Sequence, residues 1–398
     1  MGNLRGPWLT SASLAIVGIV LVAATLRGPI TSVGPLLETI RSDAGLSATA
    51  AGILSTLPLL AFAAVSPIAP ALGRRIGLER ALGASLAVLV VGVLLRSAPQ
   101  AGALFTGTAL IGVAIGLMNV LLSGLVKRDH PDRVTALTGL YTTVMGTFAM
   151  IGSGVAVPLA DATPGGWRTS LVVWAALASV ALVTWLFRAP RRRPDPEDAA
   201  AGRSDATSRA HWRSPLAWQL TAFFGLQSLG FYVAVSWLPT ILQSNGIGAT
   251  SAGWYLALMQ LTGLLASAAS PSIARRLPDQ RLFAAGSAML GVLSYAGFVI
   301  APHLALLWTA TVGLSQGVGI TLALSFFALR ACDAQQAAAL SGMGQSVGYL
   351  LAALGPLLFG LLHDRTGAWT ISLLVLTVLI GVQGVVALGA GRTRHVGG

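Results

Sequence analysis

Twelve long runs of mostly apolar residues divide this sequence, and each is long enough to form a helix that crosses a lipid bilayer. Only 10% of the 398 residues are charged, compared with roughly 25% in soluble domains. The sequence therefore predicts an all-α integral membrane protein that has the lipid bilayer as its surroundings and twelve transmembrane helices. The expected helices are 10–37, 47–73, 79–97, 101–126, 133–160, 167–188, 215–242, 250–274, 281–301, 303–329, 335–362 and 368–390.

Basic residues are concentrated on one side of the predicted membrane. Of the 25 Lys and Arg residues, 20 fall in chain ends and loops on that side. The opposite side receives Arg41, Arg96, Arg168 and Arg365, and Arg27 lies inside the first helix. Because cytoplasmic loops carry an excess of Lys and Arg, we expect both chain termini to be cytoplasmic.

A polar segment separates the apolar runs into two sets of six. Residues 189–214 are rich in Pro, Arg, Asp, Glu and Ser, a composition typical of a linker. We therefore predict an N-terminal six-helix bundle at 1–188, a cytoplasmic linker at 189–214 and a C-terminal six-helix bundle at 215–398.

The two sets of six helices resemble each other. A shift of 201 residues aligns ATAAG at 48–52 with ATSAG at 249–253, and a shift of 203 aligns ALTG at 136–139 with ALSG at 339–342. Six spans return the chain to its starting side, so the two halves are parallel and related by a pseudo-two-fold axis. This arrangement predicts the major facilitator superfamily fold, in which one half rocks against the other around a central site. The first and fourth helices of each half line the cavity in that fold.

Arg27 is the charged residue that the sequence places deepest in a predicted span. It lies about 17 residues into the first helix, and Gly28 and Pro29 follow it and interrupt the helical hydrogen bonds. A planar guanidinium suits a carboxylate, a nitro group or a small linear anion. Arg27 is therefore either a substrate contact or a structural cation bonded to the carbonyls freed beside Pro29.

No Asp, Glu or His falls near the middle of a predicted span. Proton-coupled drug exporters commonly carry the proton on a buried carboxylate, which this sequence does not offer. We expect either facilitated transport or a solute that carries its own proton as a neutral acid. A multidrug or toxic-compound exporter of the same fold is the alternative hypothesis.

Uncharged polar and aromatic residues in the spans are further candidates for the central site. An Asn or Gln in a span either joins helices by hydrogen bonds or lines a cavity, and both interpretations stay open here. The ring and hydroxyl of a Tyr suit a flat substrate. Under the 201-residue shift, Gln227 and Ser228 align with Leu26 and Arg27, which places a polar group at the same depth in both halves. The additional candidates are Asn119, Tyr232, Gln345, Gln316, Tyr141, Gln260 and Tyr349.

Other classes of protein are excluded by what the sequence lacks. A single cysteine, Cys332, allows no intrachain disulfide and no thiolate metal site. No His, Asp or Glu cluster has the spacing of metal ligands, and no Ser-His-Asp set lies at one depth. We therefore predict no catalytic residue, no metal and no cofactor. The net charge of +12 comes without a basic block interleaved with aromatics, so we expect no nucleic-acid partner.

Four segments resemble the cyanate/2-nitroimidazole transporter family of the major facilitator superfamily. The resemblance covers nearly the whole chain and implies a bacterial inner-membrane permease for a small anionic or nitro-bearing solute. It implies Arg27, Asn119, Gln227, Tyr232 and Gln345 as substrate-binding residues, and we expect a monomer. The segments are LRGPITSVGPLL at 26–37, NVLL at 119–122 with VKR at 126–128, FGLQS at 224–228 with WLP at 237–239, and LSGMGQSVGY at 340–349.

Overall fold

The computed structural model of the chain describes residues 11–188 and 211–392, except positions 278 and 333. All regular structure in these residues is helical, and no strand occurs among them. Eleven helices are long and apolar enough to cross a membrane, and one bent pair of helices supplies a twelfth crossing. The all-α fold with twelve spans is therefore confirmed.

The helices before residue 189 form the first six spans, and the first span is built from three pieces. These pieces are α1 (Ser11–Thr25), α2 (Gly28–Thr31) and α3 (Val33–Ala44). The other helices of this group, which we call the N-group, are α4 (Ala48–Val65), the short α5 (Ala69–Ile76), α6 (Leu78–Arg96), α7 (Ala101–Asp129), α8 (Val134–Asp161) and α9 (Gly166–Arg188).

The helices after residue 214 form the other six spans, which we call the C-group. They are α11 (Pro215–Ser244), α12 (Ala249–Ala274), α13 (Arg281–Ile300), α14 (Ala305–Leu329), α15 (Ala334–Thr366) and α16 (Trp369–Ala390). Short 3-10 turns occupy Pro131–Arg133, His211–Arg213 and Pro302–Leu304. Most of the linker predicted at 189–214 lies outside the described residues, so the division into two bundles joined by that linker stays a prediction.

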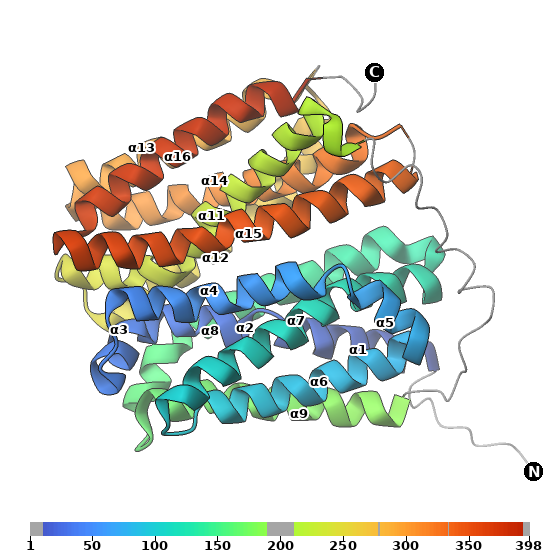
Figure 1. Cartoon of the computed structure of the whole chain (residues 1–398), viewed down its shortest axis with the longest axis horizontal. Helices are drawn as coiled ribbons and strands as arrows, with labels where there is room; N and C mark the ends of the chain where they lie inside the picture. Colours follow the sequence, from blue (N-terminus) through green and yellow to red (C-terminus); the bar gives the residue numbers. More distant parts are fainter. Residues whose placement is uncertain (1–10, 189–210, 278, 333, 393–398) are drawn as a thin grey trace, which may run out of the picture.

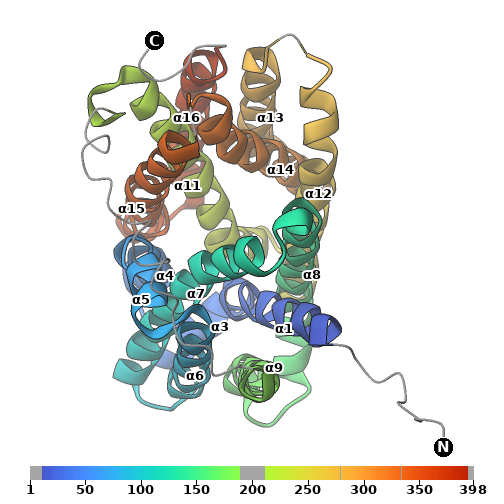
Figure 2. The same ribbon diagram turned by 90° about the vertical axis from the view of Figure 1, so that its right-hand side faces the viewer.

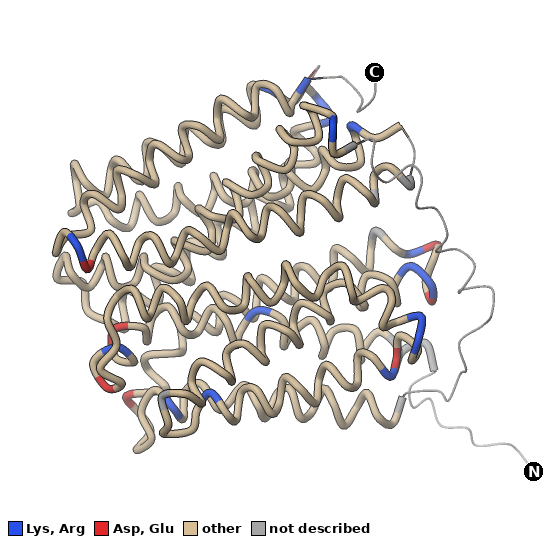
Figure 3. Tube along the Cα trace, viewed as in Figure 1, with Lys and Arg blue, Asp and Glu red and all other residues tan. Residues whose placement is uncertain are grey.

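The N-group and the C-group lie side by side (Figures 1 and 2). We call the end of the molecule where α1 begins and α16 ends the terminal face, and the opposite end the distal face (Figure 1). Charged residues gather at these two ends, and few lie between them (Figure 3). The groups meet where α4 packs on α15, α8 on α12 and α3 on α11.

Contacts between the groups are closest toward the distal face. The Asp364 carboxylate of α15 accepts hydrogen bonds from the backbone N–H groups of Ala48 and Thr49, at 3.0 and 2.7 Å, where α4 begins. A Cβ added at Gly52 would lie 2.6 Å from the Pro356 carbonyl oxygen. The structure therefore holds the groups together at the distal face.

Candidate functional site

The first span is broken at Arg27. α1 ends at Thr25 and α2 begins at Gly28, and Arg27 between them has a φ of −123° and a ψ of −42°. Pro29 has no N–H to donate, which weakens the helical ladder at this point. A second interruption follows at Ser32, where the span bends by 44° between Ile16–Thr31 and Val33–Ala44. The backbone break predicted from Gly28 and Pro29 is therefore present.

Neighbouring helices of the N-group hold this break in place. Thr31 Oγ1 donates to the Ala149 carbonyl oxygen of α8 at 3.0 Å. A Cβ on Gly28 would lie 2.2 Å from the Trp174 ring of α9, and a Cβ on Gly152 of α8 would lie 3.1 Å from the Cα of Gly28. Because only glycine fits between these elements, the position of the break is set by packing.

The Arg27 side chain reaches across the boundary between the two groups. Its Nη1 donates to the hydroxyl of Tyr232 on α11 at 3.3 Å. Its Cζ lies 5.5 Å from the centre of the Phe231 ring, within the range of a cation–π interaction. Arg27 is half-buried, and its other side-chain nitrogens make no hydrogen bond to a described residue. The guanidinium therefore keeps donors available for an anion.

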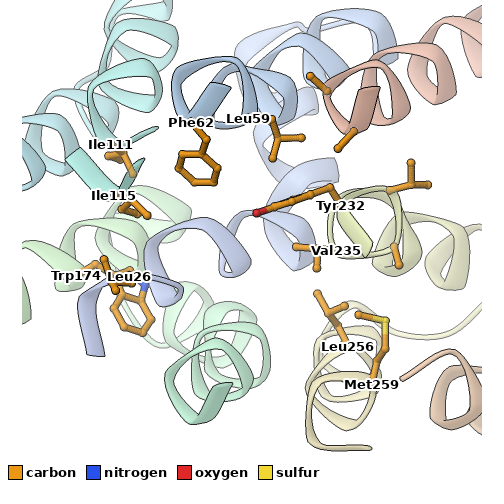
Figure 4. Close-up of a cluster of buried hydrophobic side chains, with 14 of the residues drawn as sticks. Leu26, Leu59, Phe62, Ile111, Ile115, Trp174, Tyr232, Val235, Leu256 and Met259 are labelled. Atoms are coloured by element: carbon orange, nitrogen blue, oxygen red, sulfur yellow. The ribbon is translucent and has the colours of Figure 1, made fainter. Parts of the chain in front are cut away.

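Tyr232 and Tyr349 place aromatic rings beside Arg27. Figure 4 shows Tyr232 reaching from α11 toward the helices of the N-group, near Leu59 and Phe62. The Tyr349 ring of α15 meets the Phe62 ring edge-on, with 5.7 Å between the ring centres. Tyr349 packs against the same apolar cluster that contains Tyr232. The structure thus brings three of the predicted site residues together.

Gln227 and Gln316 lie in the interior of the C-group. The Gln227 amide nitrogen donates to the Gln316 backbone oxygen at 2.9 Å and also to the Gln316 side-chain oxygen. The Gln383 amide of α16 donates to the Gln227 side-chain oxygen at 2.6 Å. These three glutamines join α11, α14 and α16, as interhelical hydrogen bonds do in membrane proteins. Their amides are engaged with one another, and a role in substrate binding stays a prediction.

Two further predicted glutamines have different surroundings. Gln260 of α12 donates to Ser153 Oγ of α8 at 3.3 Å and so joins the two groups of helices. Gln345 of α15 donates to Ser341 Oγ, one turn away in the same helix, at 2.9 Å. Gln345 is half-buried, and it lies one turn from Tyr349 toward the terminal face.

The other two candidates are half-buried in the N-group. Asn119 lies on α7 and makes no side-chain hydrogen bond to a described residue. Tyr141 lies on α8, and it packs against the main apolar cluster. No contact joins either residue to Arg27, so their part in a common site stays a prediction.

A small cavity lies on the distal side of the Arg27–Tyr232 contact. Apolar side chains from α2, α3, α4, α7 and α11 form most of its wall, and it leaves about 30 Å³ for the centres of water molecules. That space holds about one or two waters. The polar side chains in its wall are Ser55, Arg96, Thr108, Tyr232 and Ser236.

Arg96 corrects the interpretation of the charges made from the sequence. We expected this residue among the cations of the opposite side, at the end of the helix predicted at 79–97, but its side chain is 1% exposed. Its Nη1 donates to the Pro29 carbonyl oxygen at 2.6 Å. Arg96 therefore bonds a backbone carbonyl beside the break, and this is the structural role that we considered for Arg27. The sequence contained one indication of this burial, because the helix predicted at 79–97 extends one residue past Arg96.

Among the described residues, no group of three or more His, Cys, Asp or Glu side chains could hold a metal ion. The described Asp and Glu residues lie at or near helix ends (Figure 3). No described carboxylate lines the cavity, so the chemistry that this part of the molecule offers is the binding of anions and polar groups by cations and hydroxyls.

Comparisons with known proteins agree on the class of this protein. The Major Facilitator Superfamily profile matches residues 19–356. The D-xylose-proton symporter has a crystal structure that superposes with a TM-score of 0.80, with 12% identity and coverage of 96% of this chain and 100% of that chain. The chain thus has the fold of a major facilitator transporter and is a multi-pass membrane protein.

Proteins with similar sequences identify the family within this superfamily. The 2-nitroimidazole transporter of Escherichia coli is 43% identical over 381 residues, which cover 96% of each chain. The cyanate transport protein of the same organism is 28% identical over 88% of this chain and 90% of its own. The chain belongs to the cyanate/2-nitroimidazole transporter family of the major facilitator superfamily.

Proposed function

We propose that this protein carries a compact anion or a nitro-bearing heterocycle across the membrane by alternating access. Arg27 is the anchor of the central site, and Tyr232 and Tyr349 supply the aromatic walls. Asn119, Gln227, Gln345, Gln316, Tyr141 and Gln260 are additional candidates for lining the path. The protein moves the solute across the membrane and does not change it chemically.

The contact between Arg27 and Tyr232 is the observation that carries the proposal. Arg27 belongs to the N-group and Tyr232 to the C-group, and their atoms meet at 3.3 Å. A solute that accepts hydrogen bonds from Arg27 and stacks on Tyr232 would contact both groups at once. Binding at such a point is what alternating access requires, because the groups must close around the solute from either side.

A carboxylate or a nitro group matches the donors that Arg27 keeps free. Both present two oxygens in one plane, which suits the planar fork of a guanidinium. No described residue supplies the buried acid on which the drug-exporter hypothesis depends. Transport is therefore either facilitated, or the proton travels on the solute.

We place the protein in a bacterial cytoplasmic membrane, with the terminal face toward the cytoplasm, and as a monomer. Support for the orientation comes from Arg74, Arg75, Lys127 and Arg128, which lie in terminal-face loops or at the helix ends beside them. Cytoplasmic loops are the ones enriched in Lys and Arg. The E. coli origin of the two relatives supports the bacterial location.

Thermal stabilisation of the purified full chain tests the central site. Cyanate, nitrate, small carboxylates and nitroimidazoles are added at two pH values, and the shift in unfolding temperature is measured. We expect at least one of them to stabilise the wild type. Arg27→Ala should weaken that binding by about tenfold or more, since a hydrogen bond to a charged group contributes about 1.5–3 kcal/mol. Tyr232→Phe should weaken it by about two- to tenfold.

Arg75→Gln is the matched control, because Arg75 is an exposed cation of the terminal face. It should bind the same ligands as the wild type. Full ligand-induced stabilisation in Arg27→Ala would contradict the assignment of Arg27. A response to hydrophobic cations alone would favour the exporter hypothesis.

A further inference from the structure

Arg96 is a second arginine held inside the bundle. It is the last residue of α6, and one nitrogen, Nη1, donates to the Pro29 carbonyl. Its Nε and Nη2 are buried and have no hydrogen-bond partner among the described residues. A guanidinium that uses one nitrogen and leaves two unbonded is costly in a buried position. The two unbonded nitrogens could bind a group that the described residues do not supply.

The charge of Arg96 is also unmatched. Its side chain forms no ion pair with a described carboxylate, and no carboxylate lines the cavity beside it. A buried charge without a counter-charge costs much more than a paired one. Arginines inside membrane proteins accordingly face water, a partner or the path of a substrate. Arg96 has no such partner among the described residues, but its side chain lines a small cavity that could hold water or a substrate.

The shape of this cavity restricts what can occupy it. Ser55, Thr108 and Ser236 add hydroxyls to a mostly apolar wall. The space available to water centres, about 30 Å³, is too small for a whole aromatic heterocycle but admits a halide or a single carboxylate or nitro group. Tyr232 also lines the cavity, and its hydroxyl holds Arg27 on the other side. The cavity is thus next to the proposed central site, toward the distal face.

We propose that Arg96 and this cavity form a second anion-binding position on the distal half of the transport path. Its ligand is a compact monovalent anion, either an inorganic ion or the anionic end of the solute. The inference rests on the proposed function for its place on the path. A solute moving between the distal face and Arg27 would pass from one guanidinium to the other, with Tyr232 between them. The Pro29 carbonyl positions Arg96 and links it to the broken first span.

Anion binding by the purified full chain tests this position separately from Arg27. Bromide, formate and cyanate are titrated in a zwitterionic buffer of low chloride, and the shift in unfolding temperature is recorded. The variants are Arg27→Gln, Arg96→Gln and the double variant. We expect Arg27→Gln to keep a measurable response to at least one of these anions, and the double variant to lose it. Arg96→Gln should weaken that response by about tenfold or more.

Two further variants serve if Arg96→Gln does not fold, because Arg96 also bonds the Pro29 carbonyl. Arg96→Lys keeps the charge but loses the planar fork, and it should still bind less tightly. Ser55→Leu fills the cavity without touching the charge, and it should abolish the response that remains in Arg27→Gln. Ser123→Leu is its matched control, because Ser123 is exposed on α7.

The outcomes separate this inference from the proposed function. An unchanged anion response in both Arg96→Lys and Ser55→Leu would overturn the second position and leave Arg27 untouched. An unchanged solute response in Arg27→Gln would overturn the proposed central site instead. Loss of the bromide response in Ser55→Leu would identify the ligand as an inorganic ion. If Ser55→Leu instead loses only the responses to formate and cyanate, the ligand would be identified as the anionic end of the solute.

Discussion

At the scale of single residues, the two roles considered for Arg27 from the sequence are separated between two arginines. One role is to bond a backbone carbonyl beside Pro29, and the other is to bind a ligand. Arg96 bonds the Pro29 carbonyl at 2.6 Å, so the break in the first span does not need Arg27 to satisfy that oxygen. Arg27 is half-buried and bonds to Tyr232 across the groups of helices. This division supports a ligand-binding role for Arg27, because its remaining donors are not used by the backbone.

Gly28 is the residue whose replacement should disturb this site most. In Gly28→Ala the new Cβ would lie 2.2 Å from the Trp174 ring, so the ring or the helix must shift. Overpacking of this kind costs about 1–3 kcal/mol. We expect a lower unfolding temperature and weaker ligand binding, measured by the thermal-shift assay.

The matched control for Gly28→Ala is Gly139→Ala on α8, where an added Cβ would meet no atom within 4 Å. That variant should be as stable as the wild type or slightly more so, because Ala favours a helix more than Gly does. Replacing Trp174 by Leu in the Gly28→Ala background should restore part of the lost stability. Equal effects of the two glycine substitutions would show that the Trp174 contact is not the cause.

At the scale of helices, the first residues of α4 are capped by a residue of the opposite group. Asp364 near the end of α15 accepts two backbone N–H bonds from α4 and one from the Thr49 hydroxyl, at 2.6 Å. An acidic group at a helix N-terminus satisfies free donors and complements the helix dipole. This cap ties the two groups together at the distal face.

Removing the cap should favour conformations that are open at the distal face. Loss of an N-cap costs about 0.5–2 kcal/mol, so Asp364→Ala should raise the population of the open state by about two- to thirtyfold. Ser236 lines the cavity, and Ser236→Cys in a Cys332→Ser background reports the opening. We expect faster labelling by a small polar thiol reagent added from the distal side.

Asp43→Ala is the control for this experiment. Asp43 also lies near the distal face, but it bonds Trp167 and Arg168 of its own group, at 3.1 and 2.7 Å. Its loss should leave the labelling rate unchanged. A rate that rises equally in both variants would point to general loosening rather than to release of the cap.

At the scale of the whole molecule, the two groups of helices are closed at one end. The hydrogen bonds between the groups run from the Arg27–Tyr232 contact to the Asp364 cap, and Thr56 adds a bond to the Ala353 carbonyl at 2.8 Å. The structure thus resembles one end state of a rocking cycle, in which the distal face is shut.

Locking the distal face should stop transport. Thr49→Cys with Asp364→Cys, in a Cys332→Ser background, places two thiols where the side chains now meet at 2.6 Å. A short cross-linker between them should abolish uptake into vesicles while leaving ligand binding from the terminal side intact. Cleaving the linker should restore uptake.

The matched control joins two residues of one group. Asp43→Cys with Arg168→Cys lies on the same face, where those side chains meet at 2.7 Å within the N-group. Its cross-linking should leave uptake active, because rocking moves the groups relative to each other and not within themselves. Uptake that survives the Thr49–Asp364 cross-link would contradict the rocking movement.

Much of the fold was predictable from the sequence, and the candidate site only in part. Each span is a continuous apolar run, and a chain in lipid must satisfy its backbone within helices, so the number of helices follows from local composition. The break beside Arg27 follows from Gly28 and Pro29 for the same local reason. The contact between Tyr349 and Phe62 does not follow, because α15 and α4 are far apart in the sequence.

Three features depended on how separate helices come together. In the sequence Arg96 counts as a cation at the distal end of a span, and it is buried because α6 ends against the broken first span. Gln227 aligns with the region of Arg27 under the internal repeat, yet Gln316 and Gln383 bind its amide. Asp364 caps a helix of the other group.

The sequence by itself thus determined the membrane location of this protein, the number of its helices and the place where its first span breaks. These properties depend on the hydrophobicity and backbone chemistry of neighbouring residues. The tertiary structure alone decided which buried polar groups bond to each other and which keep free donors. Hydrogen bonds act only over about 3 Å, so the fate of a donor depends on which distant helix is packed against it.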